Sequence, residues 1–121
     1  MISTLYDFEQ NEEILLAEIQ NDNRKAWEFL MQKFYPMLYS FILGMVKNNE
    51  IAEELLQDIF VNFWTKRQKI QINTSLKAYL YRAARNHTLN FIKRRKFEQD
   101  YQKSLAQNMT QSKNLTEDDY I

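Results

Sequence analysis

Residues 77–96, KAYLYRAARNHTLNFIKRRK, combine cations, aromatic rings and amides in one segment. Lysine and arginine neutralise phosphates and release counterions. Asparagine can hydrogen-bond base edges, and exposed aromatic rings can stack on unpaired bases. Cations alone would suit any polyanion, so this mixture favours contact with bases, particularly single-stranded ones. The alternative interpretation is a solvated basic face on which Tyr79 and Tyr81 are half-buried.

The cations and amides of this segment share one side if residues 76–96 form a helix. At about 100° per residue, one face carries Arg82, Arg85, Asn86, Lys93 and Lys96. An adjoining stripe is lined by Lys77, Tyr81 and Arg85. The apolar side uses Leu76, Leu80, Ala83, Ala84 and Phe91. We expect Thr74 or Ser75 to cap the start of this helix.

The rest of the composition argues against catalysis and against a bound metal or cofactor. The chain has one histidine, one glycine and no cysteine. Cysteine-ligated metals and glycine-rich phosphate loops are therefore excluded. His87 has no second ligand at the neighbouring helical positions, so a surface or capping role is expected. We predict a binding protein, not an enzyme.

The net charge of zero hides a strong segregation of charge. Residues 1–65 carry 4 Lys/Arg and 11 Asp/Glu, whereas residues 66–103 carry 11 Lys/Arg and 2 Asp/Glu. Residues 104–121 carry one Lys and three acids. An acidic block followed by a basic block indicates two surfaces with two different partners.

The elements that position these residues are expected to be helices. There is only one glycine and one proline to make turns, and the hydrophobic content of 45% can support a core. No apolar run reaches the roughly 18–20 residues of a membrane span, and the N-terminus does not resemble a secretory signal. We therefore predict an all-α cytoplasmic protein with no membrane insertion.

Apolar periodicity places helices at residues 1–20, 24–47, 50–65 and 76–96. Asparagines at 21–23 and at 48–49 are expected to cap the helices that follow them. Pro36 should break or kink its helix after Phe34. Residues 66–75 read as a loop, and residues 97–121 as a polar tail without periodicity.

Residues 50–65, EIAEELLQDIFVNFWT, have more apolar positions than one core-facing stripe needs. We expect most of these side chains to be buried between neighbouring helices. The acidic side chains cluster in the first half of the segment and cannot bind phosphates, because like charges repel. Glu54, Gln57 and Asp58 are the better candidates for contact with a protein partner.

Three ordered segments carry a resemblance to a known family: AWEFLMQKFYPMLYSFIL (26–43), IAEELLQDIFVNFW (51–64) and LKAYLYRAARNHTLNFIKRRK (76–96). Together they resemble the second conserved region of bacterial sigma factors, most closely the extracytoplasmic-function branch. The resemblance implies a small bundle of about four to five helices over residues 24–97, preceded by an N-terminal helix and cap at 1–23. Residues 98–121 would be a linker or tail, with the second, minus-thirty-five-binding domain absent from this chain.

The resemblance also implies two binding surfaces and a role in transcription initiation. The acidic helix would dock on the clamp helices of the largest subunit of core RNA polymerase, through Glu50, Glu53, Glu54, Gln57, Asp58, Phe60, Val61 and Trp64. The non-template strand of the minus-ten promoter element would contact Lys66, Arg67, Lys69, Asn73, Lys77, Tyr79, Tyr81, Arg82, Arg85, Asn86, Asn90 and Lys93. Asn86 and the loop are expected to hold a flipped-out base. Tyr79 stands where relatives often carry tryptophan.

Two other readings compete with a sigma factor that directs polymerase and helps DNA melting. A stand-alone helical DNA-binding regulator would bind duplex DNA tightly without polymerase. A helical protein-binding adaptor would not use the basic face for nucleic acid. An anti-sigma factor is a further candidate partner. Such a protein could cover one of the two exposed binding surfaces of this domain.

Overall fold

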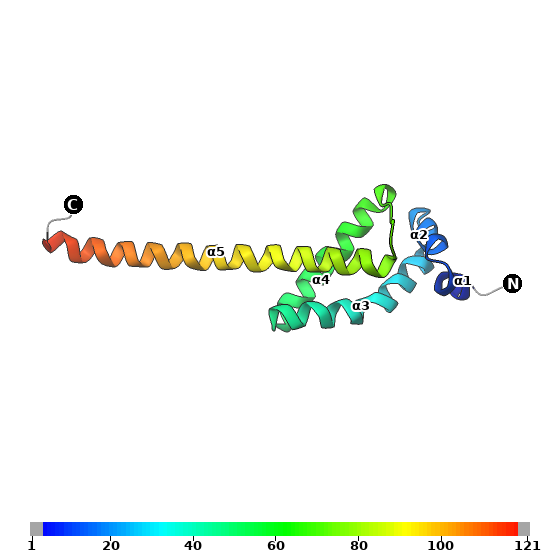
Figure 1. Ribbon diagram of the computed structural model, residues 1–121, viewed down its shortest axis with the longest axis horizontal. Coiled ribbons are helices and arrows are strands. Elements are labelled where there is room, and N and C mark those ends of the chain that lie inside the picture. Colours follow the sequence, from blue (N-terminus) through cyan, green and yellow to red (C-terminus); the bar gives the residue numbers. More distant parts are fainter. Residues whose placement is uncertain (1–3, 119–121) are drawn as a thin grey trace. The chain divides into compact units, whose positions relative to one another are not determined.

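The computed structural model describes residues 4–118, and the regular elements among them are all helical (Figure 1). They are α1 (Thr4–Gln10), α2 (Glu12–Gln20), α3 (Arg24–Val46), α4 (Asn49–Lys66), the short 3-10 helix η1 (Arg67–Lys69) and α5 (Leu76–Asp118). The chain divides after Thr88 into two units. The first unit holds α1 to α4, η1 and the start of α5, and the second holds the rest of α5. The prediction of an all-α helical bundle is confirmed.

The core of the first unit lies mainly between α3 and α4, with α1 and α2 packed against α3. Its largest fully buried side chains are Phe8, Leu15, Ile19, Leu30, Phe34, Leu38, Ile42, Leu56, Leu76, Leu80 and Thr88. Burying each large apolar side chain stabilises the fold by about 1.5–3 kcal/mol before entropy is counted. The start of α5 therefore belongs to the same core as α3 and α4.

Asparagine caps set the boundaries between the helices. Asn11 accepts hydrogen bonds from the backbone N–H groups of Glu13 and Ile14, so the helix predicted at 1–20 begins anew at Glu12. Asn23 caps α3 and Asn48 caps α4, as predicted. These side chains satisfy N–H groups that have no partner within their own helix.

The start of α5 is capped from two directions. The Ser75 hydroxyl accepts from the backbone N–H of Ala78, which confirms one of the two predicted caps. The Glu12 carboxylate, from α2, accepts from the N–H of Leu76 at 2.9 Å. A carboxylate at a helix N-terminus is also favoured by the helix dipole. The N-terminal helices thus fix the position at which α5 begins.

Pro36 does not end its helix, so of the predicted break or kink the break is wrong. The α-helix runs without interruption from Arg24 to Val46. Proline removes one backbone hydrogen bond, but Phe34 and Leu38 on either side of it are both buried. Their packing holds the helical path through the proline, whose own ring faces solvent.

The predicted loop and tail are both more helical than expected. Lys66 ends α4 and the next three residues form η1, so only residues 70–75 are irregular. The tail predicted beyond residue 96 is helical as far as Asp118, and residues 119–121 lie outside the described residues. It contains no glycine or proline to stop the helix. The assumed loss of periodicity there was wrong, because apolar residues recur at every fourth position from Phe97.

Replacing Asn23 with alanine should destabilise the first unit by about 0.5–2 kcal/mol, the usual cost of losing an N-cap. The side chain caps α3 and also donates to the Glu18 carboxylate at 2.8 Å. Urea unfolding monitored by circular dichroism measures the change. Asn21→Ala is the matched control, because Asn21 is exposed and caps through its backbone N–H. Equal effects of the two substitutions would contradict the assignment.

Candidate functional site

The first half of α4 presents an acidic surface. Glu50, Glu53, Glu54 and Asp58 are all exposed, as is Gln57 beside them. Glu50 lies in the first turn, where the helix dipole favours a negative charge. The Glu54 and Gln57 side chains, both candidates from the sequence, are free of intramolecular hydrogen bonds in the described residues. This surface suits a basic partner.

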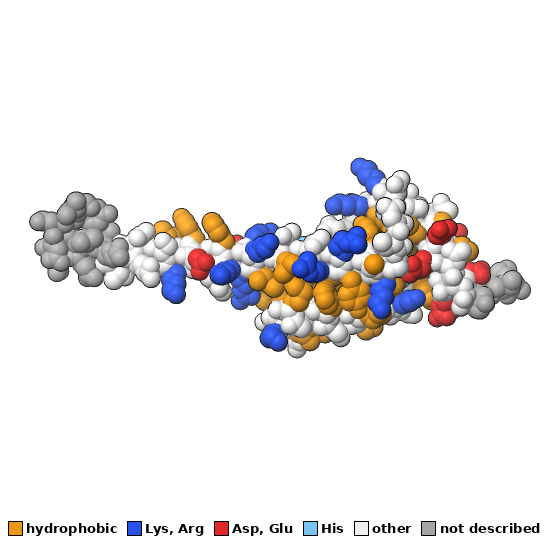
Figure 2. Space-filling model, in the orientation of Figure 1, with side chains coloured by type: hydrophobic (Ala, Val, Ile, Leu, Met, Phe, Trp, Pro, Cys, Tyr) orange, Lys and Arg blue, Asp and Glu red, His pale blue; other side chains and the backbone are white. Residues whose placement is uncertain are grey.

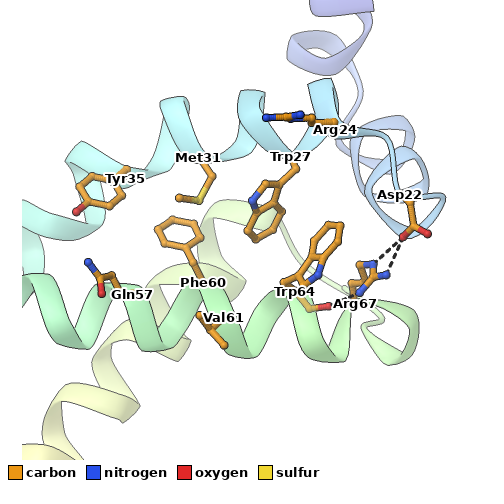
Figure 3. Close-up of a pocket in the computed structure, with 10 residues that line it drawn as sticks. All are labelled: Asp22, Arg24, Trp27, Met31, Tyr35, Gln57, Phe60, Val61, Trp64 and Arg67. Carbon is orange, nitrogen blue, oxygen red and sulfur yellow. Dashed lines mark hydrogen bonds and ion pairs between the residues drawn. The ribbon is translucent and has the colours of Figure 1, made fainter.

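An apolar groove of about 870 Å³ adjoins this surface, between α3 and α4 (Figure 3). From α3 it is lined by Trp27, Met31 and Tyr35, and from α4 by Gln57, Phe60, Val61 and Trp64. Val61 is 62% exposed and lines this groove. The sequence pattern pointed to Val61 and Trp64, but the three α3 residues were missed because only the tertiary fold brings them beside α4.

Phe60 belongs to the core more than to the surface. It is 3% exposed, meets the Trp27 ring edge-on and stacks on Tyr35, with both centroid distances 6.1 Å. Its expected contact with a partner is therefore limited to the floor of the groove. Leu55, Leu56, Ile59 and Phe63 are also buried, as expected for most of the apolar positions of α4.

Tyr35 lies at one end of the groove near the acidic surface. Burial raises the pKa of its phenol above the usual value, and the negative charge of Glu53 and the neighbouring Tyr39 raise it further. The neutral hydroxyl can donate a hydrogen bond. It lines the groove together with the polar side chains of Arg24 and Gln57.

Arg67, which the sequence predicted to contact DNA, makes three contacts within the protein. Its guanidinium pairs with Asp22 at 2.7 Å, donates to the carbonyl of Trp64 at 2.8 Å and stacks on the Trp64 indole at 3.8 Å (Figure 3). The side chain is only 19% exposed. Since Asp22 lies 45 residues away in sequence, this pairing could not be read from the local pattern.

The segment that follows α4 is anchored to α2. Gln20 donates to the carbonyls of Arg67 and Ile70, and Gln68 donates to the carbonyl of Gln20 at 2.6 Å. Lys66, Lys69 and Asn73, predicted to contact DNA, remain exposed. The anchors hold the backbone while leaving these side chains available.

Two smaller clefts border this segment. One, of about 160 Å³, lies between α4 and α5, and its walls include Lys66, Tyr79 and His87. The other, of about 480 Å³, is formed by Ile72 and Thr74 together with α1 and α2. The first cleft brings together two of the predicted DNA contacts from different helices.

The two tyrosines of α5 are half-buried. Tyr79 packs edge-on against Phe63, with a centroid distance of 5.9 Å, and Tyr81 against Phe41, at 5.2 Å. Each ring has one part in the core and another part accessible. The half-buried alternative considered from the sequence is therefore correct for both, and only their exposed parts are free to stack on a base.

The remaining predicted DNA contacts are exposed polar side chains of α5. Lys77, Arg82, Arg85 and Asn86 are exposed on the first unit. Asn90 and Lys93 lie beyond Thr88, in the second unit, and are exposed there. Figure 2 shows basic side chains gathered along α5, as the charge pattern predicted.

His87 and Asp58 form a contact that the sequence did not reveal. The His87 Nε2 lies 3.2 Å from a carboxylate oxygen of Asp58. The two residues are 29 positions apart, on α5 and α4. Asp58, expected to face a protein partner, is therefore also tied to the helix that carries the basic residues.

Within residues 7–110, no group of three or more histidine, cysteine and acidic side chains is arranged to hold a metal ion. The helices described over the same range include none with the length and hydropathy needed to span a bilayer.

The family model of Sigma-70 region 2 matches residues 30–98, from the first half of α3 into α5. The chain belongs to the Sigma-70 region 2 family. The match contains all of α4, η1 and the start of α5, which are the elements that carry the acidic surface, the anchored segment and the basic residues. Members of this family are in general not enzymes.

A curated relative and a solved structure agree with the family. The chain is 30% identical over 87 residues to the ECF RNA polymerase sigma factor SigM of Bacillus subtilis (strain 168), covering 69% of this chain and 53% of the relative. It thus spans about half the length of that protein. An NMR structure of an engineered region 2 of sigmaE in complex with GTAAAA has the same fold, with a TM-score of 0.60 and 21% identity over 68% of this chain and 85% of that one.

Replacing Arg67 with alanine should lower the free energy of unfolding by about 1–2 kcal/mol, because a charged hydrogen bond and the stacking on Trp64 are lost together. Thermal and urea unfolding measure the effect. Lys69→Ala, an exposed cation of the same short helix, is the control and should change stability little. If both variants are as stable as the parent chain, Arg67 has no structural role.

Proposed function

We propose that this protein is a sigma factor domain that directs core RNA polymerase to promoters and helps to open the minus-ten element. The observation that carries the proposal is the match to Sigma-70 region 2 over residues 30–98. Within that range, exposed acids lie on α4 and exposed cations and amides on α5. Two surfaces of opposite charge suit two partners, a basic protein surface and a nucleic acid.

The proposed polymerase surface is the acidic half of α4 with the adjoining groove. Glu54 and Gln57 supply exposed polar contacts, and Val61 and the edge of Trp64 supply apolar ones. A central apolar patch with a charged rim is the usual anatomy of a protein interface. We assign the clamp helices of the largest polymerase subunit as the partner of this surface. An anti-sigma factor that covers the same surface would compete with polymerase.

The proposed DNA surface consists of the exposed residues of α5 and the anchored segment 66–75. On the first unit we assign Lys77, Arg82 and Arg85 to phosphates and Asn86 to base edges, and on the second unit Lys93 to a phosphate and Asn90 to a base edge, because all six side chains are exposed. Arg67 is omitted from this surface because its guanidinium is already paired with Asp22. The partner is the non-template strand, whose unpaired bases expose both faces and edges.

Binding energy drives melting in this proposal, without any catalytic step. Extruding one base costs a few kcal/mol of stacking and pairing. Capture of that base in the cleft bordered by Lys66, Tyr79 and His87 offsets the cost, with Asn86 of the same helix contacting a base edge. The accessible part of Tyr79 offers a stacking surface at the same place. Opening is then selective, because only a base that fits the cleft recovers the energy.

Charge reversal by Glu54→Arg should weaken binding to purified core RNA polymerase at least about 10-fold, equivalent to about 1.4 kcal/mol. Glu54 is exposed on α4, so the fold should be unaffected. A pull-down or biolayer interferometry with the core enzyme measures the change. The control is Glu13→Arg, the same reversal of an exposed glutamate on α2. Equal binding by both variants and the parent would remove α4 from the interface.

Asn86→Ala and Lys93→Ala should affect DNA binding in different ways. The test uses single-stranded oligonucleotides that differ in a six-base sequence. Loss of the Asn86 amide should reduce the difference in affinity between these sequences, since amides hydrogen-bond base edges. Loss of Lys93 should weaken binding to every sequence and reduce the salt slope by about 1. Both residues are exposed. Fluorescence anisotropy at several salt concentrations measures both quantities.

The same titrations separate this proposal from a stand-alone regulator. A sigma domain should prefer single-stranded DNA to duplex and bind the duplex weakly without polymerase. Tight binding of duplex by the isolated chain would favour the regulator. If Asn86→Ala lowered the affinity for all sequences equally, its amide would be a backbone contact and the proposed base capture would be wrong.

A further inference from the structure

A stripe of exposed apolar side chains runs along the second unit of the chain. Phe97, Tyr101, Leu105 and Met109 recur at every fourth position of α5 and are 73%, 59%, 44% and 66% exposed. Hydrophobic side chains stand out along this part of the helix in Figure 2. With Val61 and Ile14, they make up the exposed large hydrophobic side chains of residues 7–110. A contiguous apolar stripe of this kind marks an interaction surface.

The spacing of the stripe matches the groove between α3 and α4. Residues at i, i+4, i+8 and i+12 form one ridge of a helix, and such ridges pack into the grooves between equivalent ridges. The groove is bounded by Trp27, Met31 and Tyr35 on α3, which have the same spacing. On α4 its wall includes Gln57 and Val61, again four residues apart. This groove is therefore suited to a helix whose apolar side chains recur at every fourth residue.

Complementary charges indicate in which direction the apolar stripe would lie along the groove. Four consecutive cations, Lys93 to Lys96, precede the stripe. The Tyr35 end of the groove continues into the exposed acids Glu53 and Glu50 of α4, and the charge of Glu53 acts on Tyr35. At about 1.5 Å per residue, the distance along the helix from Lys93 to Met109 is about 24 Å. The distance from Glu50 to Trp64 is about 21 Å by the same rise.

We propose that two copies of this chain form a reciprocal dimer in which the apolar stripe of each α5 fills the α3–α4 groove of the other. The stripe lies parallel to α4, with its cations over the acids. Each copy contributes one stripe and one groove. The dimer therefore has two identical contacts, related by a two-fold axis. In this arrangement the side chains of Val61 and of the four stripe residues all become buried.

The dimer has a consequence that rests on the proposed function. The stripe would cover Gln57, Val61 and Trp64, which are assigned to polymerase. Self-association and polymerase binding would then exclude each other. The chain would be held inactive at high concentration and released by dilution or by the polymerase itself.

Sedimentation equilibrium of the full chain tests the dimer without polymerase or DNA. At about 100 µM, well above a micromolar dissociation constant, we expect twice the monomer mass and no larger species. Leu105→Glu in the stripe and Val61→Glu in the groove should each raise the dissociation constant at least about 10-fold. Both positions are exposed, so both variants should fold. Gln99→Glu, the same charge change on another face of α5, should leave the dimer intact.

Mixing the two variants identifies the contact itself. The Leu105→Glu chain keeps its groove and the Val61→Glu chain keeps its stripe, so the mixture should form a heterodimer through one intact contact. A dimer that survives Val61→Glu would instead mean that stripes pair with stripes. A mixture that stays monomeric would contradict the contact between stripe and groove. A monomeric parent chain at about 100 µM would overturn the proposal, whether the stripe is unused or docks within its own chain.

Polymerase binding separates this inference from the proposed function. Leu105→Glu should bind core polymerase more tightly than the parent chain at concentrations that favour the dimer. Unchanged binding, with the dimer demonstrated, would overturn the masking of the polymerase surface. If the monomeric Leu105→Glu chain binds no polymerase at all, the proposed function fails while the dimer stands.

Discussion

The packing of α3 on α4 around Trp27 is the contact on which the rest of the structure depends. The Trp27 ring meets three aromatic rings of α4, those of Phe60, Phe63 and Trp64, at centroid distances of 6.1, 6.0 and 5.1 Å. Aromatic pairs of this kind contribute about 0.5–1.5 kcal/mol each beyond their buried area. The same cluster aligns the two helices, forms the floor of the groove and leaves Val61 projecting from it.

The aromatic cluster also reaches the surface that is proposed to face DNA. Phe63 touches Trp27 on one side and Tyr79 on the other, so α3, α4 and the start of α5 share one set of contacts. Arg67 stacks on Trp64 and pairs with Asp22, which ties the end of α4 to the turn after α2. The segment that follows is therefore rigidly placed at both ends, at Arg67 and at Ser75. Preorganisation of this kind lowers the entropy cost of capturing a base.

Segregation of charge would let one small fold serve the two unlike partners that we propose. The acids of α4 and the cations of α5 lie on different helices, and the contact between Asp58 and His87 is the point at which the two surfaces meet. The apolar groove between α3 and α4 adds a third surface. In our proposals, polymerase and a second copy of the chain would compete for this groove.

The sequence by itself determined the helical class, the main helices, the asparagine caps and the separation of acidic from basic residues. These features are local: periodicity, capping and charge are properties of residues a few positions apart. The sequence also indicated the family, through three segments in a fixed order. The tertiary structure decided what depends on distant residues. It paired Arg67 with Asp22, buried Phe60, and brought Trp27, Met31 and Tyr35 beside α4 to make the groove. It also carried the helix through Pro36, because buried side chains on both sides outweigh one missing backbone hydrogen bond.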